Sequence, residues 1–139
     1  MLLRKYMSLV GIGSAQIDLI LEKETYEPGE TVKGWFLIKG GTIEQKLKRI
    51  ECDLVRVDPI LELEEVIHTA TILTSSIIET NEENRILFTY SLPENIRTST
   101  DTLMYRFKTR LFFTQGVASV DQDVIQIIAP NQGENVSNA

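Results

Sequence analysis

The amino-acid sequence predicts an all-β protein, an antiparallel β-sandwich of about seven or eight strands. Two observations favour this fold: short runs of alternating apolar and polar residues recur along the chain, and turn-forming residues separate them. No internal stretch shows a convincing helical period, so the predicted strands must pack sheet on sheet. The 139 residues, 42% of them hydrophobic, suit a single domain with one core.

The first two strands are predicted on either side of a corner at residues 26–29. Apolar residues recur at every second position before and after this corner: Ile17, Leu19 and Leu21, then Val32, Phe36 and Ile38. In the corner, Pro28 presets one backbone angle, and Gly29 can adopt the positive φ that a type II turn requires. The sequence therefore opens with two strands joined by a turn.

The third and fourth strands follow a Gly-Gly break at residues 40–41. Alternate residues form the apolar face of the third strand: Ile50, Cys52 and Leu54. The fourth strand covers residues 66–74 and divides its residues between two faces: Val66, His68, Ala70 and Ile72, against Ile67, Thr69, Thr71 and Leu73. A short separate strand is expected within residues 75–80. Acidic residues between the third and fourth strands are expected to keep a connecting loop solvated: Glu62, Glu64 and Glu65.

Two further strands are predicted in the second half of the chain, at residues 85–92 and 103–114. Each follows a polar segment, and each has one apolar face: Ile86, Phe88, Tyr90 and Leu92 in the first, and Tyr105, Phe107, Leu111 and Phe113 in the second. Phe107 and Phe113 should therefore lie in the core.

The predicted sandwich covers residues 15–130 and ends with a strand at residues 124–128, introduced by polar residues 121–123. The tail, residues 131–139, is polar and too poor in apolar side chains to order itself. The head, residues 1–14, has apolar residues at helical spacings and predicts a short amphipathic helix. The alternative for the head is a secretory signal, because its basic start and small-residue end loosely resemble one.

The composition limits the classes of partner and compartment. The net charge of −6 argues against a general affinity for nucleic acid, which needs an excess of Lys and Arg. No run approaches the roughly twenty apolar residues of a membrane-spanning helix, so no transmembrane segment is expected. The single cysteine, Cys52, excludes an intramolecular disulfide and favours a reducing compartment. We therefore expect a cytoplasmic protein.

The sequence offers no convincing catalytic or ligand-binding constellation. His68 is the only imidazole and fits a packing role on a strand, while Cys52 lies among apolar residues, where a thiol stays protonated. Asp121 and Asp123 could give two oxygen ligands to calcium, but that ion takes about six to eight, and the neighbouring residues make a poor set. We expect no enzymatic activity, no cofactor and no metal.

The candidate binding surface is a row of cations on one face of the strand at residues 103–114. Arg106, Lys108 and Arg110 alternate with the apolar residues of that strand and lie about 7 Å apart along it. One interpretation is a site for an acidic or phosphorylated partner. The other is pairing with acidic residues on neighbouring strands, with Asp53 and Glu51 as candidates.

Several segments resemble a known family, most closely in the first third of the chain. They are Leu21-Glu22-Lys23, Thr25-Tyr26, Pro28-Gly29-Glu30, Val32-Lys33-Gly34, Ile38-Lys39-Gly40-Gly41 and Glu44-Gln45. Together with the closing Val120-Asp121, Asp123, Ile125 and Pro130, they resemble the first domain of the sporulation-control proteins of bacilli, the stage-zero sporulation protein M family.

This resemblance implies an arrestin-like fold of immunoglobulin-like sandwiches and a regulatory role that depends on binding other proteins. Family members typically carry a second sandwich, whereas this sequence passes into a polar tail after Pro130. A function that needs a cleft between two such domains is therefore not expected. The alternative function is that of a secreted or surface β-sandwich binding module. A homodimer could form through an exposed strand edge.

Overall fold

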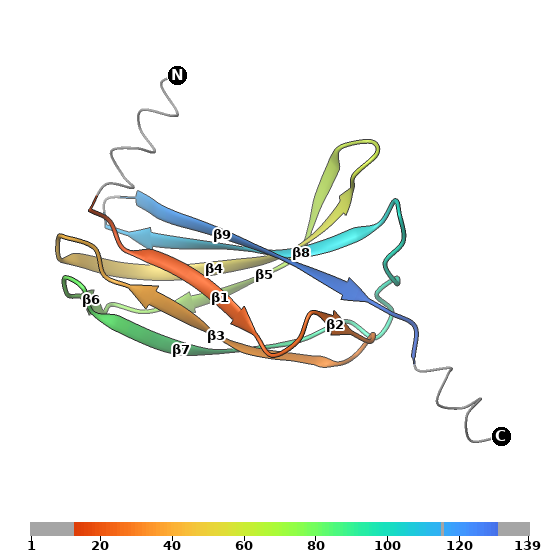
Figure 1. Cartoon of the computed structure of the whole chain (residues 1–139), viewed down its shortest axis with the longest axis horizontal. Coiled ribbons are helices and arrows are strands. Elements are labelled where there is room, and N and C mark those ends of the chain that lie inside the picture. The colour runs from red at the N-terminus through yellow and green to blue at the C-terminus, as the bar shows by residue number, and fades with distance from the viewer. Residues whose placement is uncertain (1–12, 115, 131–139) are drawn as a thin grey trace.

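The structure, a computed structural model, describes residues 13–114 and 116–130 of the chain. Nine strands form two sheets that pack face to face (Figure 1). The strands are β1 (Gln16–Leu21), β2 (Thr25–Tyr26), β3 (Thr31–Lys39), β4 (Gln45–Asp58), β5 (Leu63–Leu73), β6 (Ile77–Ile78), β7 (Glu83–Ser91), β8 (Met104–Phe113) and β9 (Gly116–Ile127). The predicted all-β class is confirmed.

The two sheets differ in size. One has three strands in the order β1-β3-β7, and the other has the order β2-β9-β8-β4-β5, with β6 paired to the start of β4. Neighbouring strands are antiparallel except for β2 and β9, which run parallel over two residue pairs. The two-residue strand β2 overlaps the predicted corner at Tyr26 and is not predicted as a strand, because so short a strand leaves no alternating pattern.

The core lies between the inward faces of the two sheets. Phe36 of β3, Phe88 of β7 and Phe107 of β8 are buried, and their rings meet edge to face with centroids 5.1 and 5.5 Å apart. Offset or edge-on ring pairs of this kind add to the stabilisation from burial alone. Phe107 and Phe113 are both buried, so their predicted core positions are confirmed.

The corner before β3 is the type II turn that the sequence predicts. The backbone N–H of Glu30 donates to the carbonyl oxygen of Glu27 at 3.1 Å, with Pro28 and Gly29 between them. Gly29 has φ +81°, in the region that a residue with a Cβ rarely adopts. This turn lets β3 begin at Thr31 and return beside β1.

Two strand boundaries differ from the prediction. β9 begins at Gly116, so Asp121 and Asp123 lie within it, whereas the sequence placed them before a later strand. β5 begins at Leu63, so Glu64 and Glu65 are part of a strand and not of a loop. In both places polar residues occupy strand positions that face solvent or a neighbouring strand, where the apolar alternation used for prediction is absent.

A bulge in β5 corrects the predicted division of its faces. The pairing of β4 with β5 shifts register between Leu54 and Val55, where Leu54 pairs with His68 and Val55 pairs with Val66. Ile67 is the extra residue, and it moves Val66 to the face opposite that of His68. The alternation predicted that Val66 and His68 share a face, and this prediction is wrong because of the bulge.

The expectations for the two ends of the chain fall outside the described residues. The amphipathic segment at residues 1–14 is described only from Gly13, and the polar tail at residues 131–139 is not described. Within the described ranges, the structure contains no helix with the length and apolar character needed to cross a membrane.

Candidate functional site

Backbone groups at sheet edges are the first candidates for binding, because they lack a neighbouring strand. On β1 this edge is closed by side chains. The backbone N–H groups of Ala15, Ile17 and Leu19 donate to Gln45 Oε1 at 2.7 Å, Ser119 Oγ at 3.2 Å and Asp121 Oδ2 at 2.8 Å. The last two acceptors lie on β9, which runs beside β1 (Figure 1). The β1 edge is therefore not available to a further strand.

The edge of β5 is open. The backbone N–H of Thr74 donates to the carbonyl oxygen of Lys48 at 3.1 Å. Counting back from Thr74 in this register, Ile72 and Ala70 are the β5 residues whose backbone groups face β4. Antiparallel ladders bond alternate residues, so the backbone groups of Thr69 and Thr71 point away from β4. Within the described residues no side chain bonds to those groups, in contrast to the capped edge of β1.

Residues 66–73 of β5 also lack the side chains that usually protect an open edge. Between Glu65 and Thr74 it carries no charged residue and no Pro, although charges, Pro and bulges are the common protections. Val66 is 53% exposed and Leu73 is 80% exposed. Glu64 and Glu65 precede this uncharged stretch on β5, and the bulge at Ile67 lies near its start.

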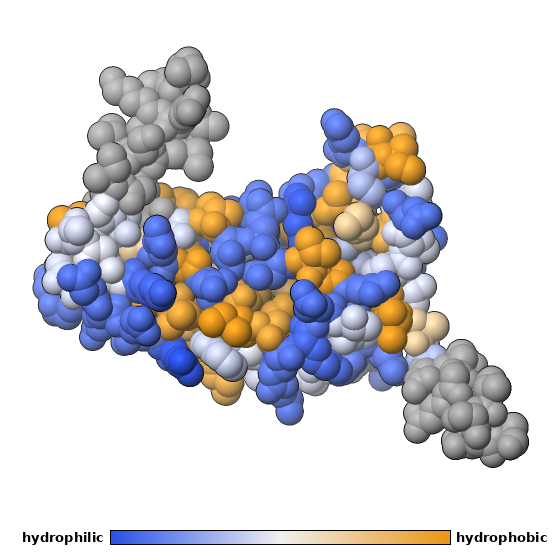
Figure 2. Space-filling model, in the orientation of Figure 1, coloured by the Kyte–Doolittle hydropathy of each residue, from blue (hydrophilic) through white to orange (hydrophobic). Residues whose placement is uncertain are grey.

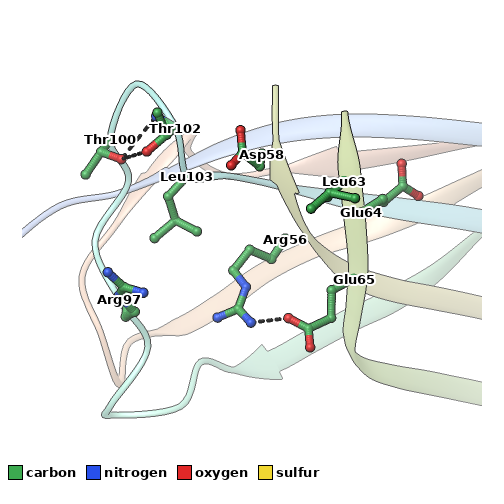
Figure 3. A pocket seen from close by; sticks show the side chains of 9 residues that line it. All are labelled: Arg56, Asp58, Leu63, Glu64, Glu65, Arg97, Thr100, Thr102 and Leu103. Atoms are coloured by element: carbon green, nitrogen blue, oxygen red, sulfur yellow. Dashed lines mark hydrogen bonds and ion pairs between the residues drawn. The ribbon is translucent and has the colours of Figure 1, made fainter. Parts of the chain in front are cut away.

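A groove lies between the N-terminal half of β5 and the loop that follows β7. It comprises two adjoining pockets of about 580 and 370 Å³, and both are lined by Arg56, Glu65 and Arg97. Figure 3 shows Arg56 of β4 paired with Glu65 of β5, while Arg97 lies on the opposite loop, apart from that pair. The apolar side chains of Leu63 and Leu103 also line the larger pocket (Figure 3).

Apolar surface continues from this groove onto the tip of the β4–β5 hairpin. Figure 2 shows the projecting hairpin as an apolar protrusion, and Ile60, Leu61 and Leu63 are each more than half exposed. The turn is held by Asp58, whose Oδ1 accepts hydrogen bonds from the backbone N–H groups of Ile60 and Leu61 at 2.9 and 3.1 Å. The exposed apolar residues therefore sit on an ordered turn.

The predicted row of cations lies on the outward face of the six-stranded sheet, where two of its members form ion pairs. Arg110 donates to Glu51 Oε1 and to Asp53 Oδ2, each at 3.0 Å, and Arg106 pairs with Glu64 of β5. No ion pair of Lys108 occurs among the described residues. The structure thus contains the pairs with Glu51 and Asp53 that the second interpretation named, and a partner site at Arg106, Lys108 and Arg110 stays a prediction.

Three carboxyl groups meet where β1 lies beside β9. Asp18 joins Asp121 and Asp123, with one oxygen of each within 4.8 Å of the others. Burial, followed by the adjacent Asp121 and Asp18, raises the pKa of Asp123 to about 8. Three carboxyl groups are fewer than the oxygens that calcium takes. Burial and the neighbouring carboxyl groups therefore favour the protonated form of Asp123.

The two residues considered for catalysis have structural surroundings. His68 stacks on Tyr90 of the facing sheet with ring centroids 5.3 Å apart. Cys52 is buried, which raises the pKa of its thiol to about 12, and Thr109 Oγ1 donates to its sulfur at 3.4 Å. A thiol with so high a pKa is protonated at neutral pH and is a poor nucleophile.

Known proteins resemble this chain in sequence and in fold. The family model described as SpoOM protein matches residues 3–139. This chain belongs to the Spo0M family. The sporulation-control protein Spo0M of Bacillus subtilis (strain 168) is 32% identical over 142 residues, which cover 98% of this chain and 55% of the relative. The Spo0M resemblance expected from the sequence is confirmed, and the chain spans about half the length of that relative.

Solved structures agree with the Spo0M assignment. The crystal structure of Spo0M from Bacillus subtilis matches with a TM-score of 0.77 and 32% identity, covering 91% of this chain and 54% of that one. A Niemann-Pick type C2 protein from Japanese carpenter ant matches with a TM-score of 0.58 at 9% identity, covering 85% of this chain and 96% of that one. The second likeness concerns the fold alone.

Sequence reasoning did not single out the β5 edge or the groove beside it. Arg56 and Arg97 are separated by 41 positions and share no motif, so only the fold brings them to one groove. The edge did leave a signal, because residues 66–73 form an uncharged strand without Pro or Gly. That pattern does not tell an edge strand from a central one without the strand order.

Proposed function

We propose that this protein is a non-catalytic regulator in the control of sporulation, which acts in the cytoplasm by binding other proteins through an arrestin-like β-sandwich. Its similarity to the sporulation-control protein of Bacillus subtilis supports the pathway. Because the chain spans about half of that relative, the role of the whole relative is an inference for this chain.

The observation that carries the binding role is the open edge of β5 beside the groove at Arg56, Glu65 and Arg97. Outward backbone groups, exposed apolar side chains and a polar groove together are typical of surfaces that bind proteins. The edge of β1, beside β9, is capped by Ser119 and Asp121, whereas the edge of β5 is accessible.

The absence of catalysis is proposed from the surroundings of the nucleophile and base candidates. A thiol or hydroxyl nucleophile needs a base within hydrogen-bond distance. The hydrogen-bond partner of the Cys52 sulfur is Thr109, and the ring of His68 packs on Tyr90, so the two do not form such a pair.

A genetic test uses the organism that encodes the chain. Deleting the gene should change the yield of heat-resistant spores, and the full-length wild-type gene should restore it. A copy with Thr71→Pro should fail to restore the yield, because proline removes an outward N–H of the β5 edge. Thr89→Pro on β7 is the matched control and should restore it. Normal sporulation in the deletion strain would contradict the proposed pathway.

A further inference from the structure

We propose that β5 takes up an extended segment of a partner protein as an additional strand, and that Arg97 holds an acidic side chain of that segment. This inference deepens the proposed function and rests on it for the role of the complex. The strand, the groove and Arg97, which forms no ion pair within the described part of the chain, define the chemistry of the segment.

The backbone of β5 supplies the first part of the binding site. Thr69 and Thr71 direct their N–H and carbonyl groups away from β4, as the bond between Thr74 and Lys48 requires. A strand laid along this edge would bond to both residues, whatever its side chains. The backbone therefore provides affinity for an extended segment without fixing its sequence.

The side chains of β5 define the middle of the segment. Residues 66–73 carry no charge, and Ile67 and Ile72 are half-buried against the core. Tyr90 and Ile86 of β7 are likewise half-buried hydrophobic residues at the margin of the core. An incoming strand with apolar side chains on its inward face would cover these residues, while a charged residue there would lose hydration without a partner.

Arg97 defines one end of the segment. It lines both pockets of the groove, and it forms no ion pair among the described residues, whereas Arg56 is paired with Glu65 (Figure 3). A carboxylate on the incoming segment would meet the Arg97 guanidinium within the groove, in the planar geometry that this group favours. We therefore expect the segment to carry Asp or Glu beside its apolar part.

The edge of β7 is a weaker candidate. The bond from the Gly40 N–H to the Glu82 carbonyl oxygen fixes the phase of the β3–β7 ladder, so Thr89 directs its backbone groups outward, as Thr71 does. However, the uncharged stretch of β7 is shorter, because Glu83 and Arg85 leave only residues 86–91 without charge, and the pockets beside Arg97 border β5 and not this strand. Charged residues on an edge oppose strand addition.

The need for a carboxylate beside Arg97 also favours a partner protein over a second copy of this chain as the occupant of the β5 edge. In antiparallel self-pairing centred on Ala70, residues 73–76 of the second copy would lie opposite residues 64–67, beside the groove. Those four residues are Leu, Thr, Ser and Ser, and none of them offers Arg97 a carboxylate. A partner segment with an acidic residue satisfies both the edge and the cation.

The test selects peptides from a random dodecapeptide display library on the immobilised full chain. Enriched peptides should share alternating apolar residues and one Asp or Glu near one end. A labelled synthetic peptide from this set should bind the wild type in fluorescence anisotropy, and an amide exchange experiment should show protection of the Thr69 and Thr71 N–H groups. Peptides without that pattern, or binding without that protection, would overturn the inference.

Variants then locate the contact. Thr71→Pro should weaken binding of the selected peptide by about tenfold or more, and Thr89→Pro should leave it within about twofold. If Thr71→Pro does not fold, Thr71→Lys keeps the N–H but places a charge on the edge, and it should weaken binding similarly. Arg97→Glu should also weaken binding, and a peptide with Lys in place of its acidic residue should recover it. Unchanged binding to the folded Thr71 variants would overturn the proposal.

The remaining outcomes separate the alternatives. If light scattering shows a wild-type dimer that Thr71→Lys converts to a monomer, a second copy occupies the edge and the inference is wrong. If peptides bind as described but the Thr71→Pro strain sporulates normally, the inference stands and the proposed function fails. If that strain sporulates poorly while no extended peptide binds the protein, the inference fails and the function stands.

Discussion

Leu19 of β1 donates its backbone N–H to Oδ2 of Asp121 on β9 at 2.8 Å, and this bond joins the three-stranded sheet to the six-stranded sheet. The two residues are 102 positions apart in the sequence. Asp123 lies two residues beyond Asp121 on the same strand, and Asp18 adjoins Leu19. The bond that closes one edge of the sandwich therefore lies within a cluster of three carboxyl groups.

This cluster predicts a dependence of stability on pH. Burial and the adjacent Asp121 and Asp18 raise the pKa of Asp123 in the folded protein to about 8, from an ordinary value of 3.8. Between these pH values the unfolded chain releases a proton that the folded protein retains, so stability falls as the pH rises from about 4 to about 8. Above pH 8 both states are ionised and the loss is constant.

The variant Asp123→Asn should remove this dependence, because an amide does not titrate. Its melting temperature relative to the wild type should rise as the pH increases from 4 to 8. Asp101→Asn, at an exposed loop position, is the control and should not show this trend. Parallel curves for Asp123→Asn and the wild type across that range would show that Asp123 does not retain its proton.

The ion pairs of Arg110 predict that this residue stabilises the fold. Asp53 is only 4% exposed, so Arg110→Ala would leave a buried carboxylate with Thr69 as its remaining side-chain partner. Because Arg110 itself is partly exposed, we expect a loss of about 1 to 3 kcal/mol in the free energy of unfolding. Lys108→Ala should change it by less than about 0.5 kcal/mol. Chemical denaturation measures both variants. Equal losses of unfolding free energy in Arg110→Ala and Lys108→Ala would mean that the ion pairs of Arg110 do not stabilise the fold.

Phe107 predicts a larger effect in the core. It is 1% exposed and its ring contacts those of Phe88 and Tyr90, so Phe107→Ala should cost about 3 to 5 kcal/mol. Phe112, the half-buried neighbour on the outward face, is the control and should cost clearly less when changed to Ala. Urea unfolding of both variants measures the difference, and a reversed order would mean that the faces of β8 are assigned wrongly.

The buried thiol of Cys52 predicts resistance to thiol reagents. Burial raises its pKa to about 12, so the folded protein should not react with an aromatic disulfide reagent at pH 8, whereas the protein unfolded in guanidinium should react at one site. A Ser91→Cys variant, with its new thiol on an exposed strand end, should react at one site while folded. Rapid labelling of the folded wild type would indicate that the core opens around β4.

The sequence was most informative where one face of a strand is buried. Phe107 lies between Arg106 and Lys108, and that contrast is sufficient to orient β8 correctly. It was least informative where the polar residues of a strand have partners in the fold. The alternation predicts Asp121 before the last strand and not within it, because its partner, the Leu19 N–H, comes from a strand far away in the sequence. The groove at Arg97 depends in the same way on contacts between distant segments.

The bonds between β1 and β9 also affect how the protein folds during synthesis. Residues that pair across 102 positions give a high contact order, which slows folding. At a synthesis rate of about 5 to 20 residues per second, Ser119 and Asp121 are synthesised about 5 to 20 s after β1. Until then its edge is as open as that of β5, and the nascent chain presents two sites for mispairing where the finished protein keeps one of them closed.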